Sequence, residues 1–196
     1  MINTYSESQL HKTLKNLYAN EFNGKVEQKI NGKICDILTE ENRIIEIQTG
    51  NLSQLKNKIE TLTPEYKMTI VYPLAIIKRI ETRSKTGTVI SNKKSPKKLN
   101  LFHIFKEITK IYPYLSKERV TLEILETEIT EIRIKTDEPI QLINKSRRFR
   151  KNWYKEDKKL NTIFCKHIFT STKDLVNILP TNLPDFFSTK DLAQAG

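Results

Sequence analysis

The chain is poor in cysteine and glycine, and it has no long apolar segment. Its two cysteines, Cys35 and Cys165, form no spacing typical of a disulfide framework and suit a reducing compartment. The 5 glycines form no phosphate-binding loop, which excludes a P-loop nucleotidase. The most apolar segment, residues 68–77, is too short to cross a bilayer, and residues 1–9 lack a signal core. We therefore expect a cytoplasmic protein with no membrane partner.

Positive charge is what the chain has in excess. There are 34 lysines and arginines against 23 acidic residues in 196, so the formal net charge is +11. Residues 1–72 are neutral overall, whereas residues 78–98 hold 8 basic and 1 acidic side chains, and residues 145–159 hold 8 and 2. A concentrated basic surface favours a polyanionic partner, with nucleic acid the default candidate. We expect these two basic blocks to bind a nucleic-acid backbone while the neutral segment carries any chemistry.

The neutral segment begins with a predicted helix and a hairpin. Apolar residues recur at helical spacing after Ser6 and Glu7, and Asn23-Gly24 ends this pattern. Asn31-Gly32 then separates two alternating segments, residues 25–30 and 33–38. Both residues of this dipeptide tolerate a positive φ, which is the strongest local sign of a type I′ hairpin.

A third strand, a second helix and a fourth strand follow. We predict strands at residues 43–49 and 67–72, and between them a helix capped by Asn51 or Ser53. The resulting order of helix, three strands, helix and strand predicts an α/β fold. The apolar positions of the two helices are Leu10, Leu14, Leu17 and Tyr18 in the first, and Leu52, Leu55, Ile59 and Leu62 in the second.

Acidic residues fall on two neighbouring predicted strands. Asp36 lies late in the second strand, while Glu46 and Gln48 lie two residues apart on the third and therefore share a face. Two converging carboxylates suit Mg²⁺, which proteins hold with one or two carboxylates, waters and phosphate oxygens. The alternative is that these carboxylates are solvated side chains on an exposed strand face.

The order of elements and the motif residues resemble the PD-(D/E)XK nuclease superfamily. The matching residues are Cys35-Asp36-Ile37 and Glu46-Ile47-Gln48. The resemblance implies that Asp36 and Glu46 bind Mg²⁺ or Mn²⁺, with the carbonyl of Ile47 as a further ligand. It also implies a role for Glu7, which matches a glutamate on the first helix of some members, and for Gln54 on the helix after the motif.

Gln48 departs from the pattern, because lysine is usual at this position of the superfamily. A glutamine can hydrogen-bond a water molecule but supplies no positive charge. The charge could come from Lys29, Lys33 or Lys58, and the sequence does not distinguish among them.

A second resemblance extends along most of the chain. Uncharacterised bacterial proteins of the superfamily carry a string Val-Glu-Ile-Gln-Thr, matched here by Ile45-Glu46-Ile47-Gln48-Thr49, and a later segment matched by Phe187-Ser-Thr-Lys-Asp-Leu-Ala193. In those proteins the later segment resembles the start of a winged helix. Ser188 or Thr189 would cap it, and the chain stops at Gly196 before a recognition helix, so we expect a partial winged-helix-like segment. The resemblance implies domain limits of 1–143, 144–179 and 180–196.

Residues 93–153 contain a further predicted helix, further predicted strands and the predicted nucleic-acid contacts. Residues 99–115 predict one helix, and residues 120–135 predict one or two half-buried strands whose glutamates form a solvated face. Residues 93–98 contain Pro96 and predict a loop. Basic side chains can neutralise phosphates while aromatic rings stack on bases. The expected contacts are Lys93, Lys94, Lys97, Lys98, Arg147, Arg148, Arg150, Lys151 and Trp153.

The function that these features favour is metal-dependent hydrolysis of DNA phosphodiester bonds. In this hypothesis Asp36 and Glu46 hold the metal, Glu7 completes the site, and Gln48 positions water. The alternative is a catalytically inactive nucleic-acid-binding or regulatory module on a nuclease scaffold, and a weaker one is a protein-interaction module with an acidic strand. A homodimer is a further expectation, because many such nucleases pair to cut two strands.

Overall fold

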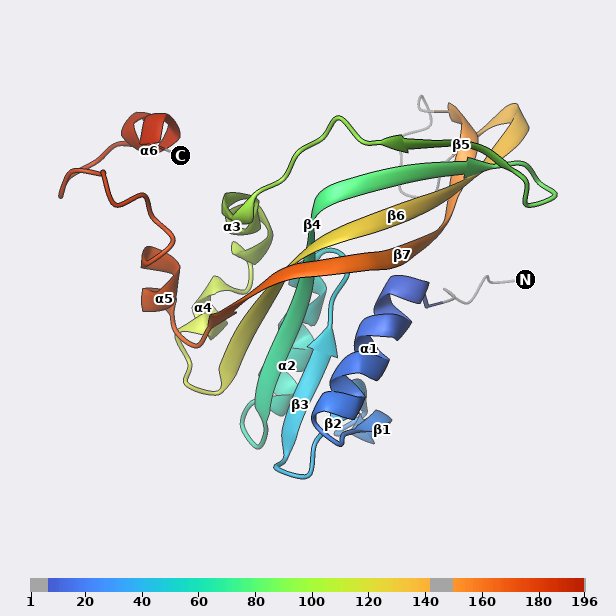
Figure 1. The fold of residues 1–196 in the computed structure, drawn as a ribbon. Helices are drawn as coiled ribbons and strands as arrows, with labels where there is room; N and C mark the ends of the chain where they lie inside the picture. Colours follow the sequence, from blue (N-terminus) through green and yellow to red (C-terminus); the bar gives the residue numbers. More distant parts are fainter. Residues whose placement is uncertain (1–6, 142–149, 196) are drawn as a thin grey trace.

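The computed structural model describes residues 7–141 and 150–195, and it confirms the predicted α/β class. A mixed sheet of seven strands runs through the molecule with helices on both faces (Figure 1). The described elements are, in chain order, α1 Gln9–Glu21, β1 Lys25–Ile30, β2 Lys33–Leu38, β3 Arg43–Ile47, η1 Leu52–Leu55, α2 Lys56–Leu62, β4 Lys67–Arg83, β5 Val89–Lys94, η2 Leu101–His103, α3 Ile104–Ile108, α4 Tyr112–Leu115, β6 Val120–Gln141, β7 Arg150–Phe169, α5 Thr172–Val176 and α6 Thr189–Ala195.

The sheet has the strand order β1-β2-β3-β4-β6-β7, and β5 pairs with the far end of β4. β3, β4 and β6 are parallel, and the other neighbouring pairs are antiparallel. The segment η1–α2 connects β3 to β4, because two parallel strands need a crossover. The helix, three strands, helix and strand predicted for the first third are therefore confirmed.

The local turn and capping signals also act as predicted. Asn31 and Gly32 have φ values of 45° and 75°, so both occupy the left-handed region that a type I′ hairpin needs. Asn51 caps the following helical segment, because its side chain accepts a hydrogen bond from the Ser53 N–H at 3.0 Å.

β4 is much longer than the predicted strand at residues 67–72. It continues through Pro73 to Arg83, and its last residues pair with β5. Lys93 and Lys94, predicted in a loop, belong to β5. The reason is non-local: β6 lies beside β4 from Met68 to Arg83 and supplies a hydrogen-bonding partner along this whole length. Figure 1 shows β4, β6 and β7 extending together beyond the helices toward β5.

The core lies on both faces of the sheet. α1 covers one face through Leu10, Leu14 and Tyr18, while Leu17, predicted on the same apolar face, is 40% exposed. α2 covers the other face together with α3, α4 and α5. The α1 side is completed by the buried residues Ile37, Ile45, Ile47, Val71, Leu125 and Ile129, and the α2 side by Cys35, Ile44, Leu52, Leu55, Ile59, Leu62, Met68 and Ile70 among others.

The prediction that the β6 glutamates form a solvated face is wrong. Glu123 and Glu131 are only 6% and 7% exposed. Glu123 accepts a hydrogen bond from the Tyr18 hydroxyl at 2.6 Å, and Glu131 pairs with Lys78 at 2.5 Å. β6 is an interior strand between β4 and β7, so tertiary neighbours cover side chains that the alternation pattern leaves outside.

The single helix predicted at residues 99–115 is three short segments, η2, α3 and α4. Pro113 lies at the start of α4, where a missing N–H is tolerated, and proline would disrupt the interior of a continuous helix. Ile104, Ile108 and Ile111 are buried, whereas Phe105 is only partly buried against the same core.

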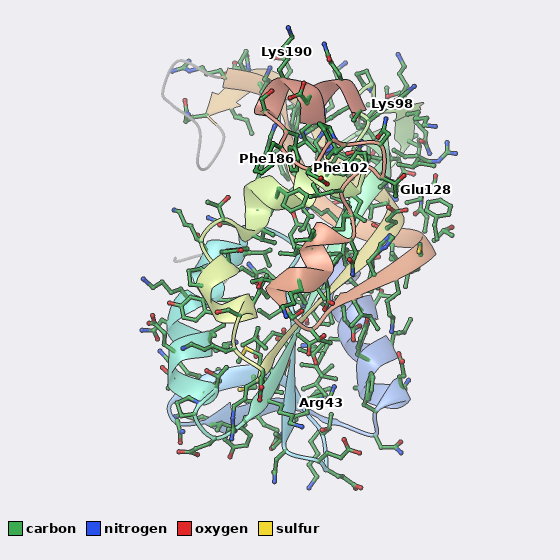
Figure 2. All side chains as sticks on the ribbon, turned by 90° about the vertical axis from the view of Figure 1, so that its left-hand side faces the viewer. Arg43, Lys98, Phe102, Glu128, Phe186 and Lys190 are labelled. Atoms are coloured by element: carbon green, nitrogen blue, oxygen red, sulfur yellow. The ribbon has the colours of Figure 1, made fainter. Side chains whose placement is uncertain are left out.

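The end of the chain contains two short helices. The capping prediction for α6 is confirmed at Ser188, whose Oγ accepts from the Asp191 N–H at 3.3 Å while its own N–H donates to Asp191 at 2.8 Å. Figure 2 shows Lys190 at the opposite end of the molecule from Arg43. None of the helices in residues 7–141 and 150–195 has the length and apolarity that crossing a bilayer requires.

Candidate active site

The site forms where β2 and β3 separate. The two strands pair at Ile37 with Ile45 and at Leu38 with Ile44. Beyond these pairs the Asp36 side chain takes the place of a strand partner, because its Oδ2 accepts the Ile47 N–H at 2.8 Å. The Asp36 N–H in turn donates to Glu46 Oε1 at 3.3 Å.

These two hydrogen bonds bring the predicted carboxylates together. Asp36 and Glu46 each accept a hydrogen bond from a backbone N–H of the other strand, which anchors one oxygen of each carboxylate. Hydrogen bonds to ionised acceptors are shorter and stronger than neutral ones. The backbone of β2 and β3 therefore holds the two carboxylates near each other.

Lys58, on the helix α2, forms an ion pair with Glu46. Glu46 is 2% exposed, and its Oε2 lies 2.6 Å from Lys58 Nζ on α2. Burial, followed by the charge of Asp36, raises the pKa of Glu46 to about 7, and the hydrogen bond from Lys58 opposes this rise. Of the three lysines that the sequence left open, Lys58 is the one at the carboxylates. Within the described segments neither Lys29 nor Lys33 makes an ion pair with them.

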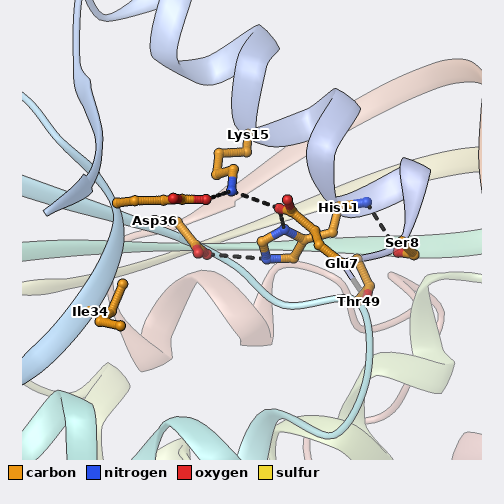
Figure 3. A pocket seen from close by; sticks show the side chains of 8 residues that line it. Glu7, Ser8, His11, Lys15, Ile34, Asp36 and Thr49 are labelled. Atoms are coloured by element: carbon orange, nitrogen blue, oxygen red, sulfur yellow. Dashed lines mark hydrogen bonds and ion pairs between the residues drawn. The ribbon is translucent and has the colours of Figure 1, made fainter. Parts of the chain in front are cut away.

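Side chains at and just before the start of α1 form a row of contacts that ends at Asp36 (Figure 3). The row consists of Glu27, Lys15, Glu7, His11 and Asp36. His11 Nε2 lies 3.3 Å from Asp36 Oδ2, and His11 Nδ1 is hydrogen-bonded to Glu7. Lys15 Nζ then bridges Glu7 at 2.8 Å and Glu27 at 2.7 Å. The row therefore alternates in charge from Glu27 to Asp36.

The row changes the pKa values of its members. Burial would raise the pKa of Asp36, but the hydrogen bond and charge of His11, with the Ile47 N–H and Lys58, outweigh it and lower the pKa. Burial would lower the pKa of His11, but Asp36 and Glu7 outweigh it and raise the pKa. The ionised forms of both Asp36 and His11 are thus stabilised by each other.

The sequence predicted a role for Glu7, and the structure adds His11 and Lys15 to it. The signal that could have found the row is the four-residue repeat of Glu7, His11 and Lys15, because residues at i and i+4 lie on one helical face. Ser8 caps α1 at this point by accepting the His11 N–H at 3.3 Å, which places Glu7 beside the first turn.

Gln48 and Gln54 contact each other rather than the carboxylates. Gln48 Nε2 donates to the Asn51 carbonyl at 3.0 Å and to Gln54 Oε1 at 3.4 Å. The Gln48 N–H donates to the Val71 carbonyl, just after β3 ends. Gln48 and Glu46 both project toward the η1–α2 segment, so the shared face expected from their spacing is present.

An open pocket of about 520 Å³ lies over this row. Asp36 and Thr49 form one wall, and the residues from α1 form another (Figure 3). The donor set fits a hard divalent cation, because Asp36 and Glu46 offer carboxylate oxygens whose like charges already raise the pKa of Glu46. Within residues 7–141 and 150–195 no group of three or more His, Cys, Asp or Glu side chains gathers in a metal-binding arrangement. The lining residues are Glu7, Ser8, His11, Lys15, Glu27, Ile34, Asp36 and Thr49.

The predicted nucleic-acid contacts of the described residues lie on β5, on the segment that follows β5, and on β7. Lys93, Lys94, Lys97 and Lys98 are exposed on β5 and the segment that follows, and Figure 2 shows Lys98 far from Arg43. Trp153, on β7, has the Arg133 guanidinium 3.7 Å from its ring centroid, so one ring face is covered.

The remaining predicted contacts lie partly within and partly outside the described residues. Arg150 and Lys151 are exposed at the start of β7. Arg147 and Arg148 lie outside the described residues. The domain limits at 143 and 179 stay predictions, and β7 pairs with β6 along most of its length.

Comparison with known proteins gives a family but no activity. Residues 8–170 match the family described as domain of unknown function DUF8091, and the chain belongs to this family. The chain is similar to an uncharacterized protein of Treponema pallidum (strain Nichols), with 31% identity over 195 residues that cover 100% of this chain and 74% of the relative. No solved structure matches the chain significantly.

Proposed function

We propose that this DUF8091 domain is a divalent-metal-dependent nuclease of the PD-(D/E)XK type that hydrolyses phosphodiester bonds of DNA. The observation that carries the proposal is the joint position of Asp36, Glu46 and Lys58. Two carboxylates from neighbouring strands and a lysine from the following helix meet at one point. Lys58 supplies the cation that Gln48, at the usual lysine position, does not.

The residues divide the work of such a site among them. Asp36 and Glu46 would hold Mg²⁺ or Mn²⁺, with the Ile47 carbonyl as a further ligand. The bound ion would lower the pKa of a water molecule and offset the charge that develops on the phosphodiester. Glu7 and His11 orient Asp36 through their hydrogen bonds, and Lys58 stabilises the ionised form of Glu46.

The charge distribution supports a nucleic-acid substrate. The net charge of +11 comes from beyond residue 72, where a basic surface can hold phosphates. The exposed lysines of β5 and the segment after it are part of this surface. Binding and chemistry are thus carried by different parts of one sheet.

A second candidate, a catalytically inactive nucleic-acid-binding module, is favoured by one observation. Each carboxylate already has a cationic partner from the protein, Asp36 in His11 and Glu46 in Lys58. These ion pairs neutralise the two carboxylates without a metal. This candidate predicts salt-sensitive DNA binding with no cleavage in any divalent ion.

Cleavage assays with matched variants separate the two candidates. Supercoiled plasmid and labelled single-stranded DNA would be incubated with the protein in Mg²⁺, in Mn²⁺ and in EDTA. The nuclease proposal expects metal-dependent products that disappear in Asp36→Asn and Glu46→Gln and persist in Glu41→Gln, a control at an exposed turn. Circular dichroism would verify that each variant folds. Products that persist in both site variants, or no products in any metal, would overturn the proposal.

A further inference from the structure

A second pocket, of about 280 Å³, lies next to the candidate active site. Its walls come from the start of α1, the residues just after β3, the middle of β4, the segment after β5, and the facing parts of β6 and β7. Four lysines line it, against one glutamate. Its polar lining residues are Thr49, Tyr72, Lys78, Lys97, Glu131, Lys155 and Lys158, and its apolar ones are Leu10, Pro73, Leu74, Ala75, Leu99 and Ile129.

The one acidic residue of this lysine pocket is already engaged. Glu131 pairs with Lys78 at 2.5 Å and with Arg133 at 2.6 Å. Lys97 and Lys155 make no ion pair with any carboxylate in the described part of the chain. The lysine pocket therefore has positive charge that these residues do not balance.

Lys158 holds a fixed position in the lysine pocket. Its Nζ donates to the Thr49 carbonyl at 3.2 Å. Burial, followed by the charge of Lys155, lowers the pKa of Lys158. Gathering cations in a partly buried place costs free energy unless an anion offsets it. Such an arrangement is expected where an anionic ligand binds.

The lysine pocket adjoins the larger pocket that Asp36 and Glu7 line. Thr49 lines both of them, and it follows Glu46 by three residues. The Gln9 N–H donates to Asp157 on β7 at 2.9 Å, which ties the start of α1 to the strand that carries Lys155 and Lys158. A chain of phosphates passing from one pocket to the next would cross Thr49.

We infer that the lysine pocket binds a phosphate group of the substrate strand, next to the phosphodiester held at Asp36 and Glu46. The inference rests on the proposed nuclease function for the identity of the strand. The chemistry of the pocket selects phosphate, because lysine ammonium groups are strong phosphate ligands. The source is either a backbone phosphodiester or a terminal 5′-phosphate.

Binding without metal tests the inference independently of cleavage. Fluorescence anisotropy of a labelled single-stranded 12-nucleotide DNA in EDTA, over a series of NaCl concentrations, would compare Lys155→Gln with Lys67→Gln. Both lysines are exposed on strands, but Lys67 is the first residue of β4 and does not line the lysine pocket. We expect Lys155→Gln to weaken binding about tenfold at ~0.1 M salt and to reduce the salt slope by about one. Lys67→Gln should retain the wild-type affinity within about twofold.

A variant that removes a negative charge from the lysine pocket, instead of a positive one, gives a second test. Glu131→Gln removes the negative charge of the lysine pocket and frees Lys78, so it should strengthen DNA binding several-fold. Oligonucleotides with and without a 5′-phosphate distinguish the two sources: equal affinity indicates a backbone phosphate, and preference for the phosphorylated strand indicates a terminal one.

The outcomes separate this inference from the proposed function. If Lys155→Gln and Lys67→Gln bind DNA alike, or if the wild-type protein does not bind it, the inference is wrong even when cleavage is observed. If the predicted binding changes occur but no metal supports cleavage, the phosphate site stands and the nuclease proposal fails.

Discussion

Lys58 Nζ lies 2.6 Å from Glu46 Oε2, which joins the middle of α2 to the end of β3. The two residues are twelve positions apart, and α2 is the crossover between two parallel strands. Because Glu46 is almost fully buried, the ammonium group is the main cation that stabilises its ionised form. The crossover helix α2 therefore supplies the cation next to a proposed metal ligand.

Replacing Lys58 should impair catalysis more than folding. We expect Lys58→Gln to reduce metal-dependent cleavage by roughly 10²-fold, because loss of one preorganised charge at a site typically costs 10²–10³. Lys56→Gln is the matched control, since Lys56 is exposed on the same helix. Initial rates of plasmid nicking measure both. Equal rates for the two variants would contradict a role for Lys58.

The row on α1 should affect activity through Asp36. Glu7→Gln removes the partner that orients His11, and we expect a loss of about tenfold in cleavage, as outer ligand-orienting groups typically cost 10–100-fold. Glu21→Gln, at the exposed end of the same helix, should leave the rate unchanged. The same DNA-binding assay in EDTA should show wild-type affinity for Glu7→Gln. A parallel loss of binding would instead indicate that Glu7 supports the fold or the substrate surface.

Glu131 should make stability depend on pH. Burial would raise its pKa, but hydrogen bonds and charges from Lys78 and Arg133 lower it below its ordinary value of 4.5. A depressed folded-state pKa adds stability above pH 4.5, and this contribution is lost as pH falls through the lowered value. At pH 7 we expect Glu131→Gln to lose about 2 kcal/mol of unfolding free energy. Urea unfolding at pH 7 and at a series of pH values below 4.5 should show the difference shrink as Glu131 becomes protonated in the folded protein.

The two glycines Gly32 and Gly50 offer a matched test of the hairpin. A Cβ atom would meet nothing within 4 Å at either position, but Gly32 has a φ of +75° and Gly50 has no positive φ. Gly32→Ala should cost about 1 kcal/mol of stability, because alanine is strained in the left-handed region. Gly50→Ala should be neutral or slightly stabilising. Urea midpoints measure both, and equal midpoints would show that the turn geometry has no energetic role.

Much of the first third could be predicted because its signals are local. Leu10, Leu14 and Tyr18 repeat at helical spacing and are buried, and Asn31-Gly32 forms the hairpin that its dipeptide favours. The positions of Asp36 and Glu46 on neighbouring strands follow from the same short-range pattern. Each depends on contacts between residues at most 13 positions apart, the separation of Lys25 and Leu38 in the hairpin.

Other features depended on residues far apart in the chain. The length of β4 follows from its pairing with β6, and the burial of Glu131 follows from β4 and β7 on either side of β6. Alternation along a strand shows which side chains share a face. It does not show whether another element covers that face.

The sequence by itself determined the α/β class, the order of the first six elements and the positions of Asp36 and Glu46 on the neighbouring strands β2 and β3. Periodicity and turn chemistry are properties of neighbouring residues, so these features can be derived from the chain alone. Only the tertiary structure decided that Lys58, rather than Lys29 or Lys33, lies at Glu46, that His11 holds Asp36, and that the lysine pocket adjoins them. These contacts join separate layers, and their geometry is set by how the whole sheet and its helices pack.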